Sequence, residues 1–341
     1  MHMETPFMIE FEEANPKYLQ IVDAVIDAIR TRKLQRGQRV PSINELSEEF
    51  LLSRDTVEKA YRELRRRGII TSVKGKGYFI NRTDIQAQLR VMLLFNKISN
   101  YKKQIYNSFV RCLGESAKVD LYIHHFNAHI FESLVQNALG LYDYYVVMPH
   151  FYEDTELALH VLQQIPPEKL ILLDRNLPQL KDIFGAVYQD FEMDICNALY
   201  EAEDMLRRYE ELILVFPEII PYPPEIARGF KRFCMETSFD FDIIREISSH
   251  TPAQKGEAYV VIEETDLVNL IKLCRSQGLQ IGKDIGIISY NETPLKEILL
   301  DGITVITTDH ERMGQLAAQL ILEKKGQKIK NNFHLIRRHS L

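Results

Sequence analysis

The stretch that decides the fold of the N-terminal part is residues 41–80, PSINELSEEFLLSRDTVEKAYRELRRRGIITSVKGKGYFI. Apolar side chains recur at helical spacing from Ile43 to Phe50, which predicts a short helix. Ser53 is a suitable N-cap for a second helix that runs to Gly68. Two strand-like runs then flank a glycine-containing tip, Lys74–Gly77. The stretch therefore predicts two consecutive helices followed by a β-wing.

The charge of this region points to DNA. Residues 30–82 hold 14 Lys and Arg against 6 Asp and Glu, a net +8 in a chain whose total is −6. A basic face on an acidic chain is typical of a module that binds phosphates. The alternative, a winged helix used only for protein contacts, would not need this charge. In a helix-turn-helix, the first turn of the second helix reaches base edges and phosphates, and here it presents Ser53, Arg54 and Thr56.

Residues 16–80 closely resemble the GntR-type winged helix. The motifs that carry the resemblance are Pro41-Ser42, Ser53-Arg54-Thr56-Val57 and Gly75-Lys76-Gly77-Tyr78-Phe79. Two positions depart from the family: many members have Arg where this chain has Asn44, and a basic residue where it has Glu58. Both family positions approach DNA, so the operator is expected to differ, with Lys59 replacing part of the lost contact. The residues predicted to bind DNA are Arg39, Ser42, Asn44, Ser53, Arg54, Thr56, Lys59, Lys74, Gly75 and Lys76.

Length and composition limit what the rest of the chain can be. A chain of 341 residues suggests two or three compact units, and its 45% hydrophobic content supports a core. No apolar run is long enough to span a membrane, and the first residues lack a hydrophobic signal region. The four cysteines are scattered without metal-binding spacing, which suits reduced thiols in the cytoplasm. The residues outside 30–82 carry a net −14 and are a poor surface for nucleic acid.

After residue 90 the pattern changes to strands that alternate with helices. Residues 81–90 are polar and predict a linker between a DNA-binding domain, 1–80, and a second domain, 91–341. Apolar strands joined by crossover helices form parallel sheets, and the two sets found here predict two doubly wound lobes. The predicted strands are 91–95, 119–126, 144–148, 170–173, 186–188, 212–216, 243–247, 258–262 and 285–289. The predicted helices between them are 101–117, 130–141, 153–165, 191–208, 223–237 and 265–277.

A cleft between two lobes is a place where small ligands bind, and the sequence favours sensing over catalysis there. No glycine follows the first strand, so a phosphate-binding loop is absent, and no G-x-S-x-G nucleophile motif occurs. His124, His125 and His129 could hold a metal, but they lie at a predicted strand end and loop, where histidines ordinarily serve surface or cleft contacts. We therefore expect no catalytic residues, no cofactor and no metal site.

Residues 91–341 resemble the periplasmic-binding-protein-like effector domain of LacI-type regulators. The resemblance rests on Leu172-Leu173-Asp174-Arg175, on Gly229-Phe230 and above all on the run 278–291, GLQIGKDIGIISYN. Thr304-Val305, Asp309 and Met313-Gly314 resemble the last crossover and helix. The fold expected is α/β, an N-terminal winged helix-turn-helix plus a two-lobed, doubly wound parallel-sheet domain. This combination resembles the arabinose-repressor branch of GntR proteins.

The resemblance implies a set of sugar-binding positions. The family's Asn-Asp pair falls on Glu263-Glu264, where Glu264 keeps the charge on a longer side chain, and the family's Arg clamp is replaced by Ile226. With no Trp in the chain, Tyr101, Phe151, Phe216 or Tyr290 would stack on the sugar. Core packing explains each of these aromatics as well, and a solvated helix start explains Glu264. The residues predicted to bind the effector are Tyr101, Asp174, Asp190, Glu264, Asn291, Glu292 and Thr308.

The sequence thus predicts a cytoplasmic transcriptional regulator, a repressor, controlled by a small sugar bound between two lobes. The expected partners are a pseudo-palindromic double-stranded operator, a monosaccharide effector and a second copy of the chain, because twofold symmetry doubles the DNA contact. Two alternatives stay open: a GntR-type regulator that senses a metal or a non-sugar ligand, and a DNA reader fused to an enzyme. The sequence leaves the sugar, its phosphorylation and the sign of its effect on DNA binding undetermined.

Overall fold

The structure of the chain is a computed structural model that describes residues 6–9, 11, 16–83, 88–218, 222–248 and 251–341. The chain divides into two compact units. The first comprises residues 1–91 with the short segments 115–120 and 135–143, and the second comprises the remaining residues. None of the described helices combines the length and the apolar character needed to cross a membrane. Part of the predicted linker, residues 84–87, lies outside the described residues.

The N-terminal part of the first unit is a winged helix, as the sequence predicts. Its buried core includes the apolar faces of α1 and α3. Asn81 still contacts the winged helix, because its backbone NH lies 2.8 Å from the Ile69 carbonyl oxygen. The next strand, β4, begins at Leu89. The predicted linker is therefore narrower than residues 81–90. The elements in order are α1 (Lys17–Arg30), β1 (Arg39–Val40), α2 (Ile43–Glu49), α3 (Arg54–Arg66), β2 (Ile70–Val73) and β3 (Gly77–Ile80).

Side-chain caps fix where helices α2 and α3 begin. The Ser42 hydroxyl accepts from the Glu45 backbone NH at 3.2 Å, and the Glu45 carboxylate accepts from the Ser42 NH at 2.6 Å, which completes a capping box. Ser53 caps α3 by accepting from the Thr56 NH at 3.2 Å. The wing is the hairpin β2–β3, paired antiparallel from Ile70 with Ile80 to Val73 with Gly77. Its tip needs the left-handed backbone of Gly75, φ 74°.

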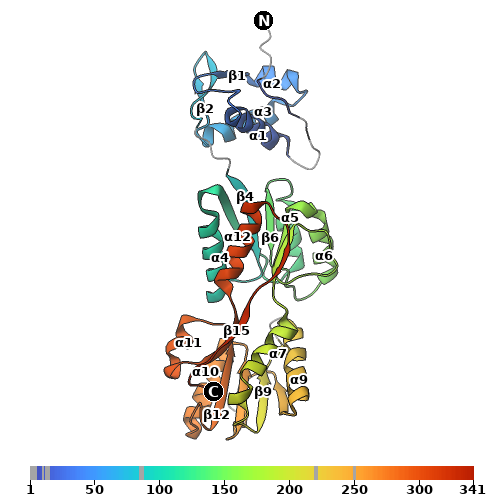
Figure 1. The fold of residues 1–341 in the computed structure, drawn as a ribbon. Coiled ribbons are helices and arrows are strands. Elements are labelled where there is room, and N and C mark those ends of the chain that lie inside the picture. Colours follow the sequence, from blue (N-terminus) through green and yellow to red (C-terminus); the bar gives the residue numbers. More distant parts are fainter. Residues whose placement is uncertain (1–5, 10, 12–15, 84–87, 219–221, 249–250) are drawn as a thin grey trace. The chain divides into compact units, whose positions relative to one another are not determined.

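Two six-stranded sheets form the lobes of the larger part of the chain (Figure 1). The first sheet has the order β14-β8-β7-β6-β4-β5 and the second the order β10-β9-β11-β12-β13-β15, in which β15 pairs antiparallel with β13. The first-lobe strands are β4 (Leu89–Phe95), β5 (Ala117–Ile123), β6 (Tyr144–Val147), β7 (Leu170–Asp174), β8 (Gly185–Tyr188) and β14 (Lys328–Lys330). The second-lobe strands are β9 (Glu211–Val215), β10 (Asp240–Ile244), β11 (Glu257–Val261), β12 (Ile285–Tyr290), β13 (Thr304–Thr308) and β15 (Phe333–Ile336).

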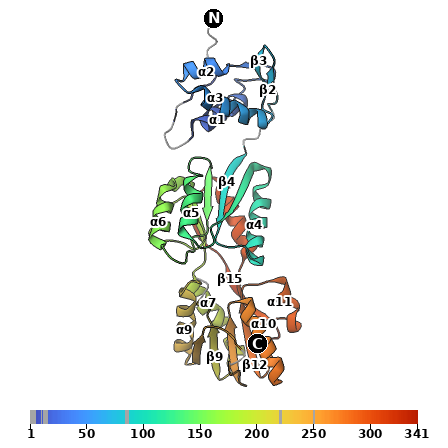
Figure 2. The same ribbon diagram turned by 180° about the vertical axis from the view of Figure 1, so that it is seen from behind.

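Helices cover both sheets, as the two views show (Figures 1 and 2). Beside the first sheet lie α4 (Asn100–Leu113), α5 (Ala128–Gln136), α6 (Thr155–Gln164) and α12 (His310–Glu323). Beside the second lie α7 (Phe191–Glu201), α8 (Glu203–Leu206), α9 (Glu225–Thr237), α10 (Glu264–Gln277) and α11 (Pro294–Ile298). Short 3₁₀ turns occur at Gly114–Ser116, Pro167–Lys169 and Leu299–Asp301.

The predicted two-lobe α/β fold is confirmed, with shifts at several boundaries. The strand predicted at 243–247 is β10, Asp240–Ile244, and the helix predicted at 191–208 is divided into α7 and α8. The strand predicted at 119–126 ends at Ile123, because His125 and Phe126 take a left-handed backbone. That turn leads the chain out of the sheet.

One close packing contact joins two helices that are far apart in the sequence. Helices α4 and α12 lie side by side although some 200 residues separate them in the sequence (Figure 1). A Cβ built on Gly314 of α12 would lie 2.1 Å from the Ser108 hydroxyl oxygen of α4, so only glycine allows this approach. The contact brings the first turn of α12 next to the first turn of α4.

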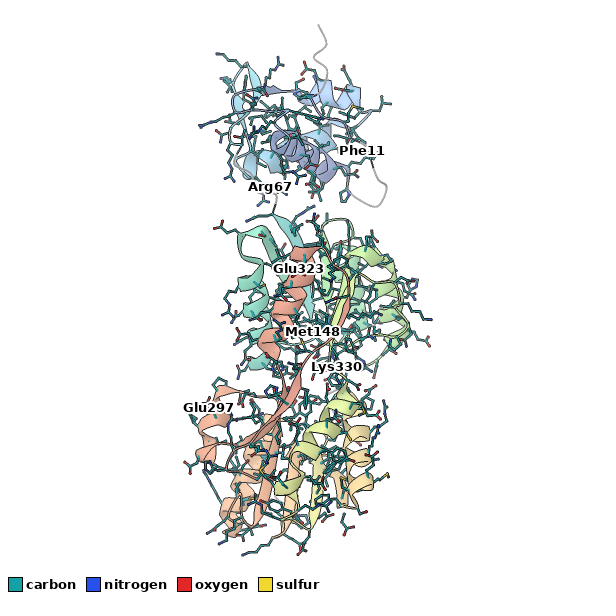
Figure 3. The ribbon with its side chains drawn as sticks, in the orientation of Figure 1. Phe11, Arg67, Met148, Glu297, Glu323 and Lys330 are labelled. Atoms are coloured by element: carbon teal, nitrogen blue, oxygen red, sulfur yellow. The ribbon has the colours of Figure 1, made fainter. Side chains whose placement is uncertain are left out.

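The chain crosses between the two sheets three times, after β8, after β13 and after β14. Asn331, in the third crossing segment, hydrogen-bonds residues of the other two crossing segments. Its side-chain amide donates to the Thr308 hydroxyl and to the Asp309 carbonyl, each at 2.8 Å, and its backbone NH donates to the Tyr188 carbonyl at 2.7 Å. Lys330, labelled at this crossing in Figure 3, lies 2.8 Å from the buried Asp194 carboxylate.

Candidate functional site

The predicted DNA-contacting side chains come from three neighbouring parts of the winged helix. Asn44 follows the start of α2, Arg54 opens α3, and Lys74 and Lys76 lie in the wing turn. These side chains, together with Arg39, Ser53, Lys59 and Gly75, are exposed, whereas Ser42 and Thr56 are half-buried. Exposed cations at a recognition helix and a wing tip can reach phosphates without first breaking a buried contact.

Several of these residues also have structural contacts. Ser42 and Ser53 use their hydroxyls as helix caps, and the Thr56 hydroxyl lies 2.7 Å from that of Ser53. The Lys59 ammonium nitrogen lies 4.1 Å from the centroid of the Tyr18 ring, a cation–π contact that holds it against α1. Arg54, by contrast, is exposed in the first turn of α3, while Lys59 is partly committed to the winged helix's own packing.

A cavity in the second unit lies where strands of both sheets end. Its empty volume, counted out to the solvent at the open mouth, is about 520 Å³. The carboxyl ends of parallel strands are the usual ligand edge of an open α/β sheet. The lining residues are Asn96, Lys97, Tyr101, Lys102, Ile105, Phe126, His150, Asp174, Gln189, Phe191, Tyr222, Pro223, Ile226, Tyr290, Asn291 and His310.

Asp174 is the centre of a hydrogen-bond network in this cavity. Its side chain is 14% exposed, and its two carboxylate oxygens accept from His150, at 2.9 Å, and from the Gln189 amide. Burial alone would raise the pKa of Asp174, but the hydrogen bond and charge of His150, with the nearby Lys102, hold that pKa well below its usual range. The carboxylate is thus ionised and ready to accept hydrogen bonds from a ligand.

Lys102 supplies a buried amine to the same cavity. It lies in the first turn of α4, is 3% exposed, and its ammonium donates to the Asn96 side-chain oxygen. Burial lowers the pKa of Lys102 to about 7, although the charge of Asp174 opposes the shift. Near neutral pH the protonated and neutral forms of this amine therefore coexist.

His310 and Tyr101 form an aromatic corner next to Lys102. Their ring centroids are 4.9 Å apart, one from the start of α12 and one from the start of α4. Burial lowers the pKa of His310 to about 4, so its ring is neutral at physiological pH. Burial likewise raises the pKa of Tyr101, which keeps the phenol protonated. Both groups can donate or accept a hydrogen bond without carrying charge.

At the mouth of the cavity, Lys97 meets the acidic side chain of Glu263. The Lys97 ammonium nitrogen lies 3.6 Å from a Glu263 carboxylate oxygen and 5.4 Å from the centroid of the Tyr222 ring. The Tyr222 hydroxyl donates to the same Glu263 carboxylate. Lys97 follows β4 of the first sheet, whereas Tyr222 and Glu263 belong to the second lobe, so the three side chains link the two lobes.

Two buried polar atoms of lining residues lack a hydrogen-bond partner among the described residues. They are the Tyr290 hydroxyl oxygen and the Gln189 side-chain oxygen. Tyr290 is 3% exposed and Gln189 is 8% exposed. A buried polar atom without a partner costs about 1–3 kcal/mol. A ligand that brings hydroxyls into the cavity would supply both missing partners.

Three of the predicted effector residues, Tyr101, Asp174 and Asn291, line this cavity. Asp190, Glu264, Glu292 and Thr308 do not. The Asp190 carboxylate caps α7 by accepting from the Met193 NH at 3.3 Å, and the Thr308 hydroxyl donates to the Asn332 carbonyl at 3.0 Å.

The two glutamates are also placed away from the lining. A Glu292 carboxylate oxygen lies 2.7 Å from the Arg338 guanidinium, and Glu264 is exposed in the first turn of α10. Of the predicted Glu263-Glu264 pair, the member that contacts lining residues is therefore Glu263. Among the aromatics considered for stacking, Tyr101 and Tyr290 line the cavity, whereas Phe151 stacks on His124 with ring centroids 4.7 Å apart.

Two of the three histidines considered as metal ligands have other contacts. His124 is buried with Nε2 3.1 Å from the Met148 carbonyl oxygen, while His129 is exposed and lies 3.5 Å from the Asp154 carboxylate. Among the described residues, no group of three His, Cys, Asp or Glu side chains is arranged to hold a metal.

Lining residues that the sequence analysis did not single out include Lys102, His150, Gln189, Tyr222 and His310. Gln189 follows β8, and His150 comes shortly after β6. Their positions after strand ends were the signal that could have identified them, since parallel strands end at one sheet edge. Lys102 and His310 carry no such signal, because each lies in the first turn of a helix.

Comparison with known families defines the class of protein. Residues 17–80 match the family "Bacterial regulatory proteins, gntR family", and residues 207–341 match the periplasmic binding protein-like domain. A regulator from Mycobacterium tuberculosis, Rv1152, is 30% identical over 84 residues, which are 25% of this chain and 69% of that protein. The arabinose metabolism transcriptional repressor of Geobacillus stearothermophilus is 31% identical over 78 residues, 23% of this chain and 21% of that protein.

Solved structures show the same two-lobed fold. The trehalose repressor from Escherichia coli superposes with a TM-score of 0.59 at 16% identity, over 73% of this chain and all of that one. A dimeric Lac repressor gives a TM-score of 0.60 at 15% identity, over 74% of this chain and 98% of that one.

The chain is therefore a DNA-binding transcriptional regulator with a periplasmic-binding-protein-like domain. It belongs to the gntR family of bacterial regulatory proteins.

Proposed function

We propose that this regulator is a homodimeric repressor whose operator binding is controlled by a neutral monosaccharide held in the cavity. The observation that carries the proposal is the buried polar set: Asp174 is ionised, and the Tyr290 hydroxyl and Gln189 oxygen lack partners. A polyol satisfies all three, because each hydroxyl both donates and accepts. The proposed site works by binding and not by chemistry, which agrees with the regulatory names of the relatives.

The charges around the cavity favour a neutral ligand over a sugar phosphate. Lys102, whose pKa is lowered to about 7 by burial, lies near Asp174, and Lys97 is paired with Glu263, so the lining has no surplus of positive charge. His310 is neutral at physiological pH, and burial lowers the pKa of His150 as well. A phosphate brings up to two negative charges and would need surplus cations, which this lining does not offer.

The structure changes the set of residues that we propose for the ligand. Tyr101, Asp174 and Asn291 remain from the sequence analysis, and Asp190, Glu264, Glu292 and Thr308 are replaced. Lys102, His150, Gln189, Tyr290 and His310 take their place because each lines the cavity with a polar group. Among the lining aromatic rings, we propose Tyr101 and Tyr222 to cover an apolar sugar face.

On the DNA side, we propose that Arg54 reads a base edge and that Lys74 and Lys76 contact phosphates. Asn44, Ser53 and Thr56 complete the surface at the starts of α2 and α3. A second copy of the chain would double this contact on a pseudo-palindromic operator. Such a regulator acts where the DNA is, in the cytoplasm, and residues 91–341 would supply the effector site and the dimer contact.

A binding screen of the full-length chain tests the proposal. Isothermal titration calorimetry against a panel of neutral aldoses and their phosphates should find a neutral sugar that binds wild type, and Asp174→Asn should weaken that binding by about ten- to a hundredfold. Lys255→Ala is the matched control, because Lys255 pairs with Asp284 at 3.2 Å and does not line the cavity. Binding that favours phosphates, or that survives Asp174→Asn unchanged, would reject the proposed site.

A further inference from the structure

The two lobes contribute very different walls to the cavity. The first-lobe elements and the crossing after β8 supply two apolar side chains, Ile105 and Phe126, and eight polar ones: Asn96, Lys97, Tyr101, Lys102, His150, Asp174, Gln189 and His310. The second lobe supplies Phe191, Tyr222, Pro223, Ile226, Tyr290 and Asn291. Three of these six, Phe191, Pro223 and Ile226, have no polar side-chain atom, so a ligand meets hydrogen-bonding groups mainly on one side.

The apolar side chains of the second lobe are grouped. Phe191 opens α7, Pro223 precedes α9, and Ile226 lies in the first turn of α9. Helices α7 and α9 pack against each other, and Phe191 and Ile226 belong to one buried core cluster. We call Phe191, Pro223 and Ile226 the apolar wall. The wall is closely packed: Phe191 is 7% exposed and Ile226 is fully buried.

The polar groups of the second lobe lie elsewhere along its sheet. Tyr290 ends β12 and Asn291 follows it, whereas Pro223 and Ile226 follow β9. Strand β11 separates β9 from β12 in the sheet. The hydroxyl of Tyr222, the polar atom next to the wall in sequence, is already bound to Glu263. A hydroxyl placed against the wall would therefore meet polar groups that are already paired: Tyr222 with Glu263, and His150, whose ring centroid lies 6.1 Å from that of Phe191, with Asp174.

We propose that the natural ligand is a 6-deoxyhexose, whose methyl group lies against the apolar wall while its ring hydroxyls face the polar lobe. This inference rests on the proposed function and adds the identity of one substituent. An aromatic ring alone would cover the C–H face of any sugar. Pro223 and Ile226 are aliphatic, and aliphatic side chains form a pocket for a methyl group and cannot satisfy a hydroxyl.

Matched sugars that differ at one carbon test the inference on the full-length chain. Calorimetry would compare L-fucose with L-galactose, L-rhamnose with L-mannose, D-fucose with D-galactose and D-quinovose with D-glucose. For each pair that binds, the pentose with the same configuration of ring hydroxyls is measured as a third ligand. We expect one 6-deoxyhexose to bind at least about tenfold more tightly than its hydroxymethyl counterpart, because the extra hydroxyl loses its water partners against the wall.

The other outcomes are distinguishable. If the hydroxymethyl sugar or the pentose binds as tightly as the 6-deoxyhexose, this inference is wrong while the proposed neutral-sugar function stands. If no sugar of the panel binds, the proposed function fails and the inference fails with it.

Substitutions in the wall give a second, independent readout. Ile226→Thr places a hydroxyl in the wall and should reduce the preference for the methyl sugar to below about threefold. Ile226→Val removes one methylene, keeps the wall apolar and should retain the preference. Thermal unfolding of both variants checks that they are folded. A preference that is the same in wild type and in folded Ile226→Thr would overturn the role of the wall.

Discussion

The DNA reader and the ligand cavity place their charges in opposite ways. In the reader, cations such as Arg54 and Lys76 are exposed at a helix start and a wing tip, in a region with a net +8. In the cavity, Lys102 is 3% exposed and Asp174 is 14% exposed, and no positive charge is in surplus. DNA binding by the winged helix should therefore release counterions as phosphates are bound. Ligand binding in the cavity should instead replace water molecules by the hydroxyls of the ligand. The two binding reactions should respond differently to salt, mutation and pH.

Salt should separate the two reactions by the largest factor. Operator affinity should fall by about 10³-fold or more between 50 and 200 mM salt, as expected for a dimer that makes six or more phosphate contacts. Affinity for a neutral sugar should change by less than about twofold, because a neutral ligand displaces no counterions and Asp174 and Lys102 are largely shielded from salt by burial. Fluorescence anisotropy and calorimetry over the same salt series measure both. A sugar affinity that falls as steeply as operator affinity would contradict the comparison.

Within the reader, Arg54 and Lys76 should differ in kind. Arg54→Ala should cost about 1–3 kcal/mol on the operator and little on random DNA, because a guanidinium reads a base edge by paired hydrogen bonds. Lys76→Ala should weaken both DNAs alike and lower the salt slope by about 1. Anisotropy titrations with operator and scrambled duplexes compare the two. Equal losses on both duplexes for Arg54→Ala would show that this residue also acts only through its charge.

Within the cavity, Lys102 should make sugar binding depend on pH. A sugar that accepts from the ammonium binds the protonated form better and so raises the pKa of Lys102 above its free value of about 7. Affinity is then highest below pH 7 and falls, by about fivefold, as the pH rises through 7. His310 does not contribute in this range, because burial holds its pKa at about 4. Calorimetry from pH 6 to 9 should show the fall in wild type and a flat profile in Lys102→Met; a fall that persists in the variant assigns the titration elsewhere.

The smallest effect should come from the acidic pair at the cavity mouth. Glu263→Gln removes the charge that meets Lys97 and Tyr222, and should weaken sugar binding by up to about fivefold, since partly exposed ion pairs contribute about 1 kcal/mol or less. Glu264→Gln is the matched neighbour and should leave binding unchanged. Calorimetry of the two variants decides which glutamate acts. A larger loss for Glu264→Gln would restore the residue that the sequence favoured.

The reader was predictable from the sequence because its signals are local. Each helix cap involves residues only three positions apart: Ser42 with Glu45 at the start of α2, and Ser53 with Thr56 at the start of α3. The glycines of the wing tip likewise lie inside one short hairpin. The lobes were predictable as element types for the same reason. The predicted bounds of β10 were wrong because the strand is half exposed. Asp240 and Asp242 alternate with apolar residues in its first half, so only the apolar end of the strand was recognised and the predicted range lay three residues too late.

The cavity was predictable only in part because tertiary packing assembles it. Lys102 is a helical lysine in a polar segment, which in the sequence is indistinguishable from a solvated one. It becomes buried when α12 packs on α4 through Gly314 and Ser108, a contact between segments about 200 residues apart. Asp174 and Thr308 were both predicted from the family resemblance and both end a strand, but Asp174 lines the cavity whereas Thr308 is used by the crossing through Asn331. Strand-end position alone therefore does not determine which polar residue faces the ligand.

Operator release by the bound sugar tests the central claim most directly. In anisotropy titrations of the full-length chain on its operator, the sugar identified by calorimetry should release wild type at concentrations that follow its dissociation constant. Asp174→Asn should bind the operator as wild type does and stay bound at those concentrations, because only the cavity is altered. If a sugar that calorimetry shows to be bound leaves the operator affinity of wild type unchanged, or if it releases Asp174→Asn as readily as wild type, the cavity does not control the reader.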